Sequence, residues 1–526
     1  MFEFMQLIKV SFLQMLNAMQ VTRGSRKRFG AVGALALIAF LALYLSGLYS
    51  NMLGGMFVEA GIGEFFIPVM SLIVVPLSLV LTLQSAGSVL FGGKDTDFLL
   101  SLPVSTFYVS LSRMSALYLE SLLFSGLWMI PVGVVAYGRG IVSDAGCFVR
   151  MIPAVLTIPL LDSLLSGVCG FLMTLAGSRT KHKALAQNLA GILLFLVFFL
   201  GAMQINNLTA FLLSHREEAW RLFHTWLLPF GLIGEGIGGS WGALLCVFLL
   251  CLVPFLAFTW LFSARYKRIL AGLQSRALRS DYRLGRLDSQ GQGTALLKKE
   301  IVRLFSTPAY LMNCCISVVM LVGFAVWTVF DRKNIELLRT VLGEGWIAPL
   351  FLICMEVLVA MIYPAAVSVS LEGKTLWILK EAPVDCRLLF ASKAALNLVV
   401  SVPALVLTTA MFVLSGNVHA LDGICMLLST LALSVFLALA GLIVNLHFPC
   451  LDAGNDMRVV KNSASALIAA FGGLLFAGIL VLLLIFTRSL LSFPVFCLLL
   501  AAVLCAGAVL LWKYLERRGT EIFREL

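Results

Sequence analysis

Long apolar runs, separated by short polar segments, extend over almost the whole chain. Each of twelve runs is about as long as the roughly 20 apolar residues that a helix needs to cross a bilayer. The runs lack the strict alternation of apolar and polar residues that marks a membrane β-barrel strand. The pattern predicts an all-α polytopic membrane protein of about 12 transmembrane helices. They are expected at residues 30–50, 67–91, 107–137, 148–177, 188–213, 240–263, 309–330, 347–371, 388–415, 420–446, 464–487 and 491–512.

The composition agrees with this interpretation. Hydrophobic residues make up 60% of the 526 residues and charged residues only 12%, whereas soluble domains average about 25% charged residues. A soluble enzyme and a disordered or fibrous protein are therefore excluded. The 12 cysteines lie mostly in the apolar runs, with no C-x-x-C pair and no histidine at metal-ligand spacing. They predict unpaired thiols of a cytoplasmic membrane and no metal site.

Positive charge is distributed unevenly among the polar segments. If the N-terminus is cytoplasmic and the sides alternate, 30 of the 38 Lys and Arg fall on the cytoplasmic side and the other 8 outside, when residues at span ends are assigned to the nearer side. Membrane proteins show this excess in their cytoplasmic loops. We expect a multi-pass protein of the bacterial cytoplasmic (plasma) membrane with both termini cytoplasmic. The net charge of +11 then reflects topology and lipid contact, and no nucleic acid is expected as a partner.

One long polar stretch divides the chain. Residues 264–308 hold ten of the Lys and Arg and follow the sixth predicted span. We interpret this stretch as a cytoplasmic linker with an interfacial helix. It joins a first six-span half, residues 1–263, to a second, residues 309–526.

Two short cytoplasmic segments, 93–106 and 373–386, resemble each other. Gly-Lys at the start and Pro-Val near the end match at a constant offset of 280 residues. Because six is an even number of spans, the halves are expected to form a parallel repeat. Each segment predicts a short helix that ends at Pro, after which Ser105 or Asp385 caps the next helix.

Both predicted short helices place apolar side chains in a cytoplasmic loop. Exposed apolar residues require a partner surface, which is either a soluble protein or the lipid interface. We favour docking onto a protein because the segment is duplicated. The predicted docking residues are Lys94, Asp97, Phe98, Leu99, Leu102, Pro103, Lys374, Trp377, Ile378, Leu379 and Pro383.

The layout resembles the membrane subunit of type-2 ATP-binding-cassette (ABC) exporters. Residues 95–105 read DTDFLLSLPVS and are similar to the phrase LLxSLPIS that is common in such permeases. The loop 448–462 resembles the family's P-x-x-D-W-x-N-E…V-V-K stretch, with Ala453 and Asp456 in place of its Trp and Glu. The resemblance implies six spans per half and a coupling helix between the second and third spans that docks on an ATPase.

The same resemblance implies partners and a further element. Cytoplasmic ABC ATPase subunits, in two copies, would bind ATP and Mg, and this chain would hold no cofactor. An extracellular re-entrant hairpin between the fifth and sixth spans would correspond to residues 216–239, which are aromatic, glycine-rich and too broken for a span. An interfacial aromatic helix is the alternative for that stretch.

No catalytic motif stands in the context that its chemistry requires. A P-loop needs G-x-x-x-x-G-K-[ST] after a strand. Residues 373–375 read GKT, but Ser368 stands where the first glycine is required. The chain contains no H-E-x-x-H, and its G-x-S-x-G match at residues 238–242 lies at the start of a predicted membrane span and does not follow a strand. We therefore predict no catalytic residue, no metal and no enzyme activity here, with ATP hydrolysis in a separate subunit.

Three acidic residues fall within predicted spans: Glu120, Asp162 and Glu356. A charge inside the membrane is costly, so such residues usually face a cavity or a polar partner. Asn397 lies within one turn of the repeat position of Glu120. We interpret these four residues as candidates for a substrate pathway that accepts a cationic amphipathic molecule. Protonated acids that hydrogen-bond to neighbouring helices are the alternative.

The sequence thus predicts the permease subunit of an ABC transporter. It would export an amphipathic peptide, lipid or drug-like substrate, powered by a separate ATPase. A proton- or ion-coupled secondary transporter that uses the intramembrane acids is the alternative, and an integral-membrane enzyme or scaffold is a third. A secondary transporter would leave the paired cytoplasmic segments unexplained.

Overall fold

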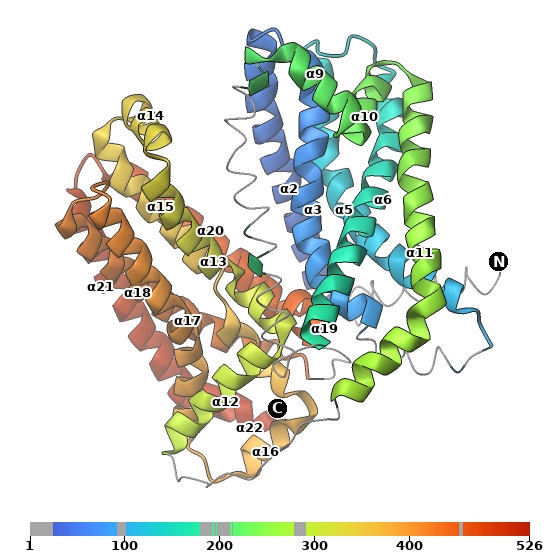
Figure 1. Ribbon diagram of the computed structural model, residues 1–526. Helices are drawn as coiled ribbons and strands as arrows, with labels where there is room; N and C mark the ends of the chain where they lie inside the picture. The colour runs from blue at the N-terminus through green and yellow to red at the C-terminus, as the bar shows by residue number, and fades with distance from the viewer. Residues whose placement is uncertain are drawn as a thin grey trace. The chain divides into compact units, whose positions relative to one another are not determined.

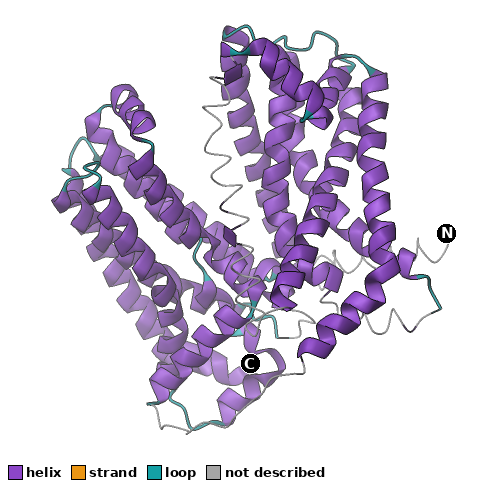
Figure 2. Ribbon diagram, in the orientation of Figure 1, coloured by secondary structure: helices purple, strands orange, loops and turns teal. Residues whose placement is uncertain are grey.

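The regular elements of the described part of the chain are all helices (Figure 2). The computed structural model describes residues 25–91, 103–178, 214–277, 291–451 and 456–526, with a few single positions between them. The chain divides into two compact units, Met1–Asp281 and Tyr282–Leu526. The division falls inside the stretch 264–308, whose first part continues a helix of the first unit and whose last part is a helix of the second.

The described residues of the first unit form five long helices and a pair of short ones (Figure 1). A short 3-10 turn, Gly63–Phe65, lies between the first two. Most of the fifth predicted span, 188–213, lies outside the described residues. The helices are α2 (Ser25–Glu59), α3 (Phe66–Phe91), α5 (Thr106–Gly138), α6 (Cys147–Ser178), α9 (Arg216–Thr225), α10 (Leu228–Gly238) and α11 (Trp241–Ala277).

Where the structure describes it, the second unit contains six helices at the predicted spans and five shorter ones (Figure 1). They are α12 (Gln292–Ser306), α13 (Pro308–Phe330), α14 (Arg332–Leu342), α15 (Ile347–Ala360), α16 (Leu376–Glu381), α17 (Cys386–Leu414), α18 (Ala420–His447), α19 (Asp456–Asn462), α20 (Ala464–Thr487), α21 (Phe493–Tyr514) and α22 (Thr520–Glu525). The 3-10 turns η2 (Glu344–Trp346), η3 (Pro364–Val367) and η4 (Ser370–Thr375) and the π-helical turn η5 (Leu515–Gly519) lie between them.

The prediction of a helical, multi-span protein is confirmed. Within the described residues, nine helical stretches are long and apolar enough to cross a membrane. α2 and α3 occupy the positions of the first two predicted spans. The apolar side chains face lipid as well as the interior, because membrane helices need no polar outer surface.

Each unit is organised around its own apolar core. In the first unit, α3, α5 and α6 pack against one another, and α11 packs on α5 and α6. In the second unit, α18 packs against α15, α17, α20 and α21. A separate cluster, here called the basal core, lies beside α12, α16 and α22. Its buried members include Val369, Leu376, Leu389, Phe390, Leu442 and Phe523.

The stretch 216–239 forms a hairpin of two short helices, α9 and α10. Glycine allows the close packing of this hairpin: a Cβ at Gly231 would lie 2.6 Å from the carbonyl oxygen of Phe223, and one at Gly234 would lie 2.6 Å from Pro68. α10 packs against α3, α6 and α11. The glycines that make the stretch too broken for a span therefore have a packing role.

The contact between α15 and α20 predicts a position-specific effect on stability. A Cβ at Gly473 would lie 2.6 Å from the carbonyl oxygen of Ala360. We expect Gly473→Ala to lower the free energy of unfolding by about 1–3 kcal/mol through overpacking, measured as a lower thermal midpoint in detergent. Gly472→Ala is the matched control, because nothing lies within 4 Å of its Cβ position. Equal midpoints for the two variants would contradict this packing.

The α9–α10 hairpin predicts a dependence on pH. His224 Nε2 lies 2.7 Å from Glu235 Oε1, and its Nδ1 donates to the carbonyl oxygen of Trp220 over 2.9 Å. The hydrogen bond to Glu235 raises the pKa of His224 above its ordinary value of 6.5. The pair therefore stabilises the hairpin fully below about pH 6.5, and this contribution is lost as the pH rises through the higher folded-state pKa.

Because both side chains of this pair are partly exposed, its contribution should stay below about 1 kcal/mol. We expect the thermal midpoint of the wild type to exceed that of His224→Gln at acidic pH, and the difference to vanish at alkaline pH. A difference that is constant across this range would show that the ion pair contributes nothing.

Candidate functional site

The helix expected over 347–371 ends early, at Ala360. The next residues form the two 3-10 turns η3 and η4 instead of a continuous helix. Pro364 explains the break, because proline has no N–H and disfavours helical conformation in the residue before it. Among these residues, Ala365 to Val369 are fully buried. Non-helical backbone in such a place requires hydrogen-bond partners from the protein itself.

Two buried asparagines supply these partners. The Asn397 side-chain oxygen accepts from the backbone N–H of Ala365 over 3.4 Å, and its nitrogen donates to the carbonyl oxygen of Ile362 over 3.1 Å. The Asn445 side-chain oxygen accepts from the N–H groups of Val369 and Ser370 over 2.8 and 3.1 Å. Both amides therefore hold the broken segment in place of helical hydrogen bonds. The role of Asn397 in a substrate pathway stays a prediction.

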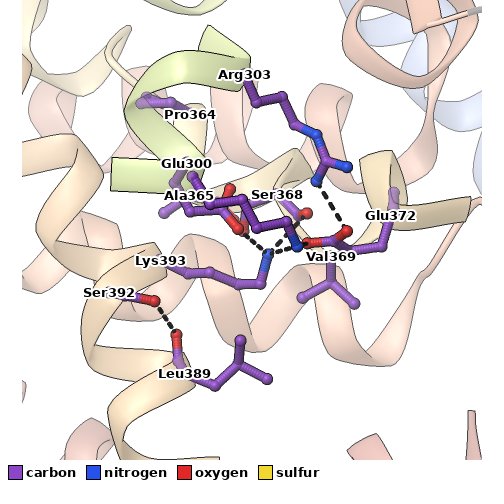
Figure 3. A network of polar contacts seen from close by, with 12 residues as sticks. Glu300, Arg303, Pro364, Ala365, Ser368, Val369, Glu372, Leu389, Ser392 and Lys393 are labelled. Carbon is purple, nitrogen blue, oxygen red and sulfur yellow. Dashed lines mark hydrogen bonds and ion pairs between the residues drawn. The ribbon is translucent and has the colours of Figure 1, made fainter. Parts of the chain in front are cut away.

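A buried lysine lies at the centre of this region. Lys393, near the start of α17, is 0% exposed. Its Nζ donates to Glu300 Oε1 over 2.7 Å, to Glu372 Oε1 over 3.1 Å and to the carbonyl oxygen of Ser368 over 3.1 Å. Figure 3 shows these three contacts converging on the ammonium group. The lysine thereby joins α12, the segment after α15, and α17.

Two further basic residues of α12 complete the cluster. Lys299 Nζ lies 2.8 Å from Glu372 Oε1, and Arg303 Nη1 lies 2.9 Å from Glu372 Oε2. Glu372 thus has three basic partners although its side chain is 2% exposed. We call Lys299, Glu300, Arg303, Glu372 and Lys393 the polar junction. A buried charge requires such compensation, because its desolvation is costly.

A related contact occurs in the first unit. Arg113, which corresponds to Lys393 at the offset of 280, donates from Nη1 to the carbonyl oxygen of Val89 over 3.2 Å. The acceptor of Lys393, Ser368, falls within one residue of the repeat position of Val89. In both units the basic residue therefore binds the backbone of the preceding span.

The polar junction leads directly into the second predicted docking helix. α16 begins at Leu376, which is 4% exposed and belongs to the basal core. Leu379 is half-buried against that core. Trp377 and Ile378 point away from it and are 62% and 51% exposed. The short helix is thus anchored by one face and presents a large apolar pair on the other.

The other predicted docking residues differ in what the structure says of them. Lys374, Pro383 and Pro103 are exposed. The remaining residues of the first copy lie outside the described residues, namely Lys94, Asp97, Phe98, Leu99 and Leu102.

The predicted caps that follow both docking segments are present. Ser105 Oγ accepts from the N–H of Tyr108 over 3.5 Å, and Asp385 Oδ1 accepts from the N–H of Arg387 over 2.9 Å. Each cap fixes the first turn of the following span.

The three intramembrane acids are divided between the two units. Asp162 is fully buried on α6 and Glu120 is half-buried on α5, both in the first unit, whereas Glu356 is 2% exposed on α15 of the second. Glu356 Oε1 has no hydrogen-bond partner among the described residues. The described residues contain no group of three or more His, Cys, Asp or Glu that could hold a metal ion.

The polar junction predicts a strong effect of removing its lysine. Lys393→Met would leave Glu300 and Glu372 buried with less compensation, which costs about 3–5 kcal/mol when one partner of a buried pair is removed. We expect a large fall in the thermal midpoint in detergent and partial recovery in Lys393→Met/Glu300→Gln. Lys513→Met, at an exposed position of α21, is the control. If Lys393→Met has the same thermal midpoint as the control, the contacts of Lys393 do not stabilise the fold.

Comparison with known proteins identifies the family. No curated protein and no solved structure matches this chain. A family model described as a membrane protein of 12 TMs matches residues 34–513. This agrees with the twelve predicted spans. Described helices lie at eleven of these positions, although α15 covers only the first part of 347–371, and most of 188–213 lies outside the described residues. Because the match takes in most of the sequence, the chain belongs to this family of membrane proteins with twelve transmembrane segments.

Proposed function

We propose that this protein is the permease subunit of an ABC exporter of the bacterial cytoplasmic membrane. It would move an amphipathic peptide, lipid or drug-like substrate, using energy from two copies of a separate cytoplasmic ATPase. The observation that carries the proposal is α16, which exposes Trp377 and Ile378 while its other face is fixed in the basal core. The resemblance of residues 95–105 to exporter permeases supports it.

The exposed pair has the properties of a docking surface. Tryptophan is enriched among the residues that dominate binding energy at protein interfaces. The pair is flanked by Lys374 and Lys380 and by Glu381 and Asp385, which are all exposed. A charged rim around an apolar centre suits a partner groove that is apolar inside and polar at its edge. We infer that the ATPase presents such a groove.

The polar junction would connect docking to the spans. Glu372 lies four residues before Leu376, and its carboxylate binds Lys393 of α17 and Arg303 of α12. A displacement of α16 would therefore move α12 and α17 with it, because breaking buried ion pairs costs more than moving the elements together. Packed elements of this kind move as rigid bodies, which is what rocking of the spans requires.

In this proposal, ATP and Mg bind to the partner subunit, as the resemblance implies. The residues 373–375 that read GKT lie in η4, where Glu372 and Thr375 engage the polar junction and the local backbone. A P-loop instead cradles phosphate between a strand and a helix. This environment supports a docking role for the segment, with hydrolysis in the partner.

The proposal predicts the effect of charging the exposed face of α16. In Trp377→Asp/Ile378→Asp, two carboxylates replace the apolar centre while Leu376 and Leu379 keep the helix anchored. We expect the purified membrane complex to lose its ATPase subunit and at least about tenfold of its ATP hydrolysis, a loss that corresponds to about 1.4 kcal/mol of interaction. Co-purification from native membranes in mild detergent would measure it.

Trp226→Asp is the matched control, because Trp226 is 88% exposed on the hairpin that we expect outside the cell. This variant should retain the ATPase. If the α16 double variant folds with a normal thermal midpoint and keeps a full complement of ATPase, docking through α16 is refuted.

A further inference from the structure

A carboxylate in the first unit is surrounded by hydroxyl groups. Asp162, on α6, is 0% exposed. Ser78 Oγ donates to Asp162 Oδ2 over 3.0 Å, and Thr82 Oγ1 donates to the same oxygen over 3.2 Å. Ser121 Oγ of α5 lies 2.9 Å from Ser78 Oγ. We call these four residues the hydroxyl–carboxylate cluster, which joins the mutually packed helices α3, α5 and α6.

The charge of Asp162 lacks compensation. Its second oxygen, Oδ1, is buried without a hydrogen-bond partner among the described residues. No described Lys, Arg or His is among the groups that act on this carboxyl. An ionised carboxylate without a counter-charge is strongly unfavourable in an apolar interior. A proton on Oδ2 would still leave Oδ1 without a partner among the described residues.

The hydroxyl groups can act as ligands as well as donors. Thr82 Oγ1 lies 3.1 Å from the carbonyl oxygen of Ser78 and 3.3 Å from that of Leu79. Its hydrogen can therefore turn to the backbone of its own helix, which leaves the oxygen lone pairs free for a cation. Ser121 and Ser78 offer further neutral oxygens. The donor set consists of oxygen alone, and hard cations prefer such ligands.

The charge of the cluster indicates how much positive charge a bound cation should carry. One carboxylate is neutralised by one positive charge, so a monovalent cation balances the cluster. Glu120, the neighbour of Ser121 on α5, acts electrostatically on Asp162 and favours entry of a cation. The three hydrogen-bonded oxygen pairs lie 2.9 to 3.2 Å apart, so they need to separate less around a small ion than around a large one.

We propose that the hydroxyl–carboxylate cluster is a sodium ion site within the first unit. Asp162 supplies the charged ligand, and Ser78, Thr82 and Ser121 supply neutral oxygens from the two adjacent helices. The bound ion holds α3, α5 and α6 together in the apolar interior. The site requires no ATPase and goes beyond the proposed transport function.

The test compares sodium with potassium and choline at equal ionic strength and fixed pH. We expect Na⁺ to raise the thermal midpoint of the purified protein in detergent in a saturable manner, with little effect of K⁺ or choline. Ligand binding to the folded state produces such a shift. Asp162→Asn should abolish the shift, and binding of radioactive sodium to the purified protein should fall to background in the same variant.

Thr82→Val keeps the shape of the side chain while removing one oxygen, and should raise the sodium concentration needed for half of the shift severalfold. Thr259→Val is the matched control, because Thr259 is 0% exposed and its hydroxyl donates to Phe255 of its own helix. This variant should respond to Na⁺ as the wild type does.

Three results would overturn the proposal. One is a wild-type midpoint that is equal in Na⁺, K⁺ and choline, including the case in which it changes with pH alone. Another is a sodium shift that Asp162→Asn retains. If Asp162→Asn fails to fold, the third result is a sodium dependence in Thr82→Val equal to that of the wild type, which would also overturn the proposal. Because no ATPase takes part, these results leave the docking of α16 to its own experiment.

Discussion

The second unit depends on one constraint: backbone that leaves the helical conformation inside an apolar bundle must find its hydrogen bonds in the protein. The segment after Ala360 meets this requirement through the amides of Asn397 and Asn445 and the ammonium of Lys393. Because these groups come from α17 and α18, the broken segment keeps these hydrogen bonds only while those helices are packed against it. The position of α16, which follows the segment, is therefore set by the whole bundle.

The same constraint explains what the sequence could and could not predict. Long apolar runs reveal spans because length and hydropathy are local properties, and the caps at Ser105 and Asp385 are local as well. The break after Ala360 leaves no gap in the apolar run, and only Pro364 marks it. The partners of the broken backbone lie 25 to 76 residues away in the sequence, and hydrophobic periodicity does not reveal pairs at such separations.

The polar junction shows an intermediate case. Lys393 stands out in the sequence as the counterpart of Arg113 at the offset of 280. It also lies only a few residues after the polar segment 373–386. Its main partner, Glu300, lies 93 residues away on the helix before the seventh span, so only the fold brings the two together. The hydroxyl–carboxylate cluster is harder still to predict. Serine and threonine are common in membrane helices, and Ser78, Thr82 and Ser121 follow no sequence pattern that would link them to Asp162.

The length of α11 has a mechanical consequence. Its 37 residues correspond to about 55 Å of continuous helix at roughly 1.5 Å per residue, whereas the hydrocarbon core is about 30 Å thick. The helix is therefore longer than the hydrocarbon core is thick. Pro254 lies within it and lacks the N–H of a helical hydrogen bond, which is where long helices bend. A change in this bend would turn a small rotation of one part of the helix into a larger sideways displacement of its end at Ala277, close to the point where the chain leaves the first unit.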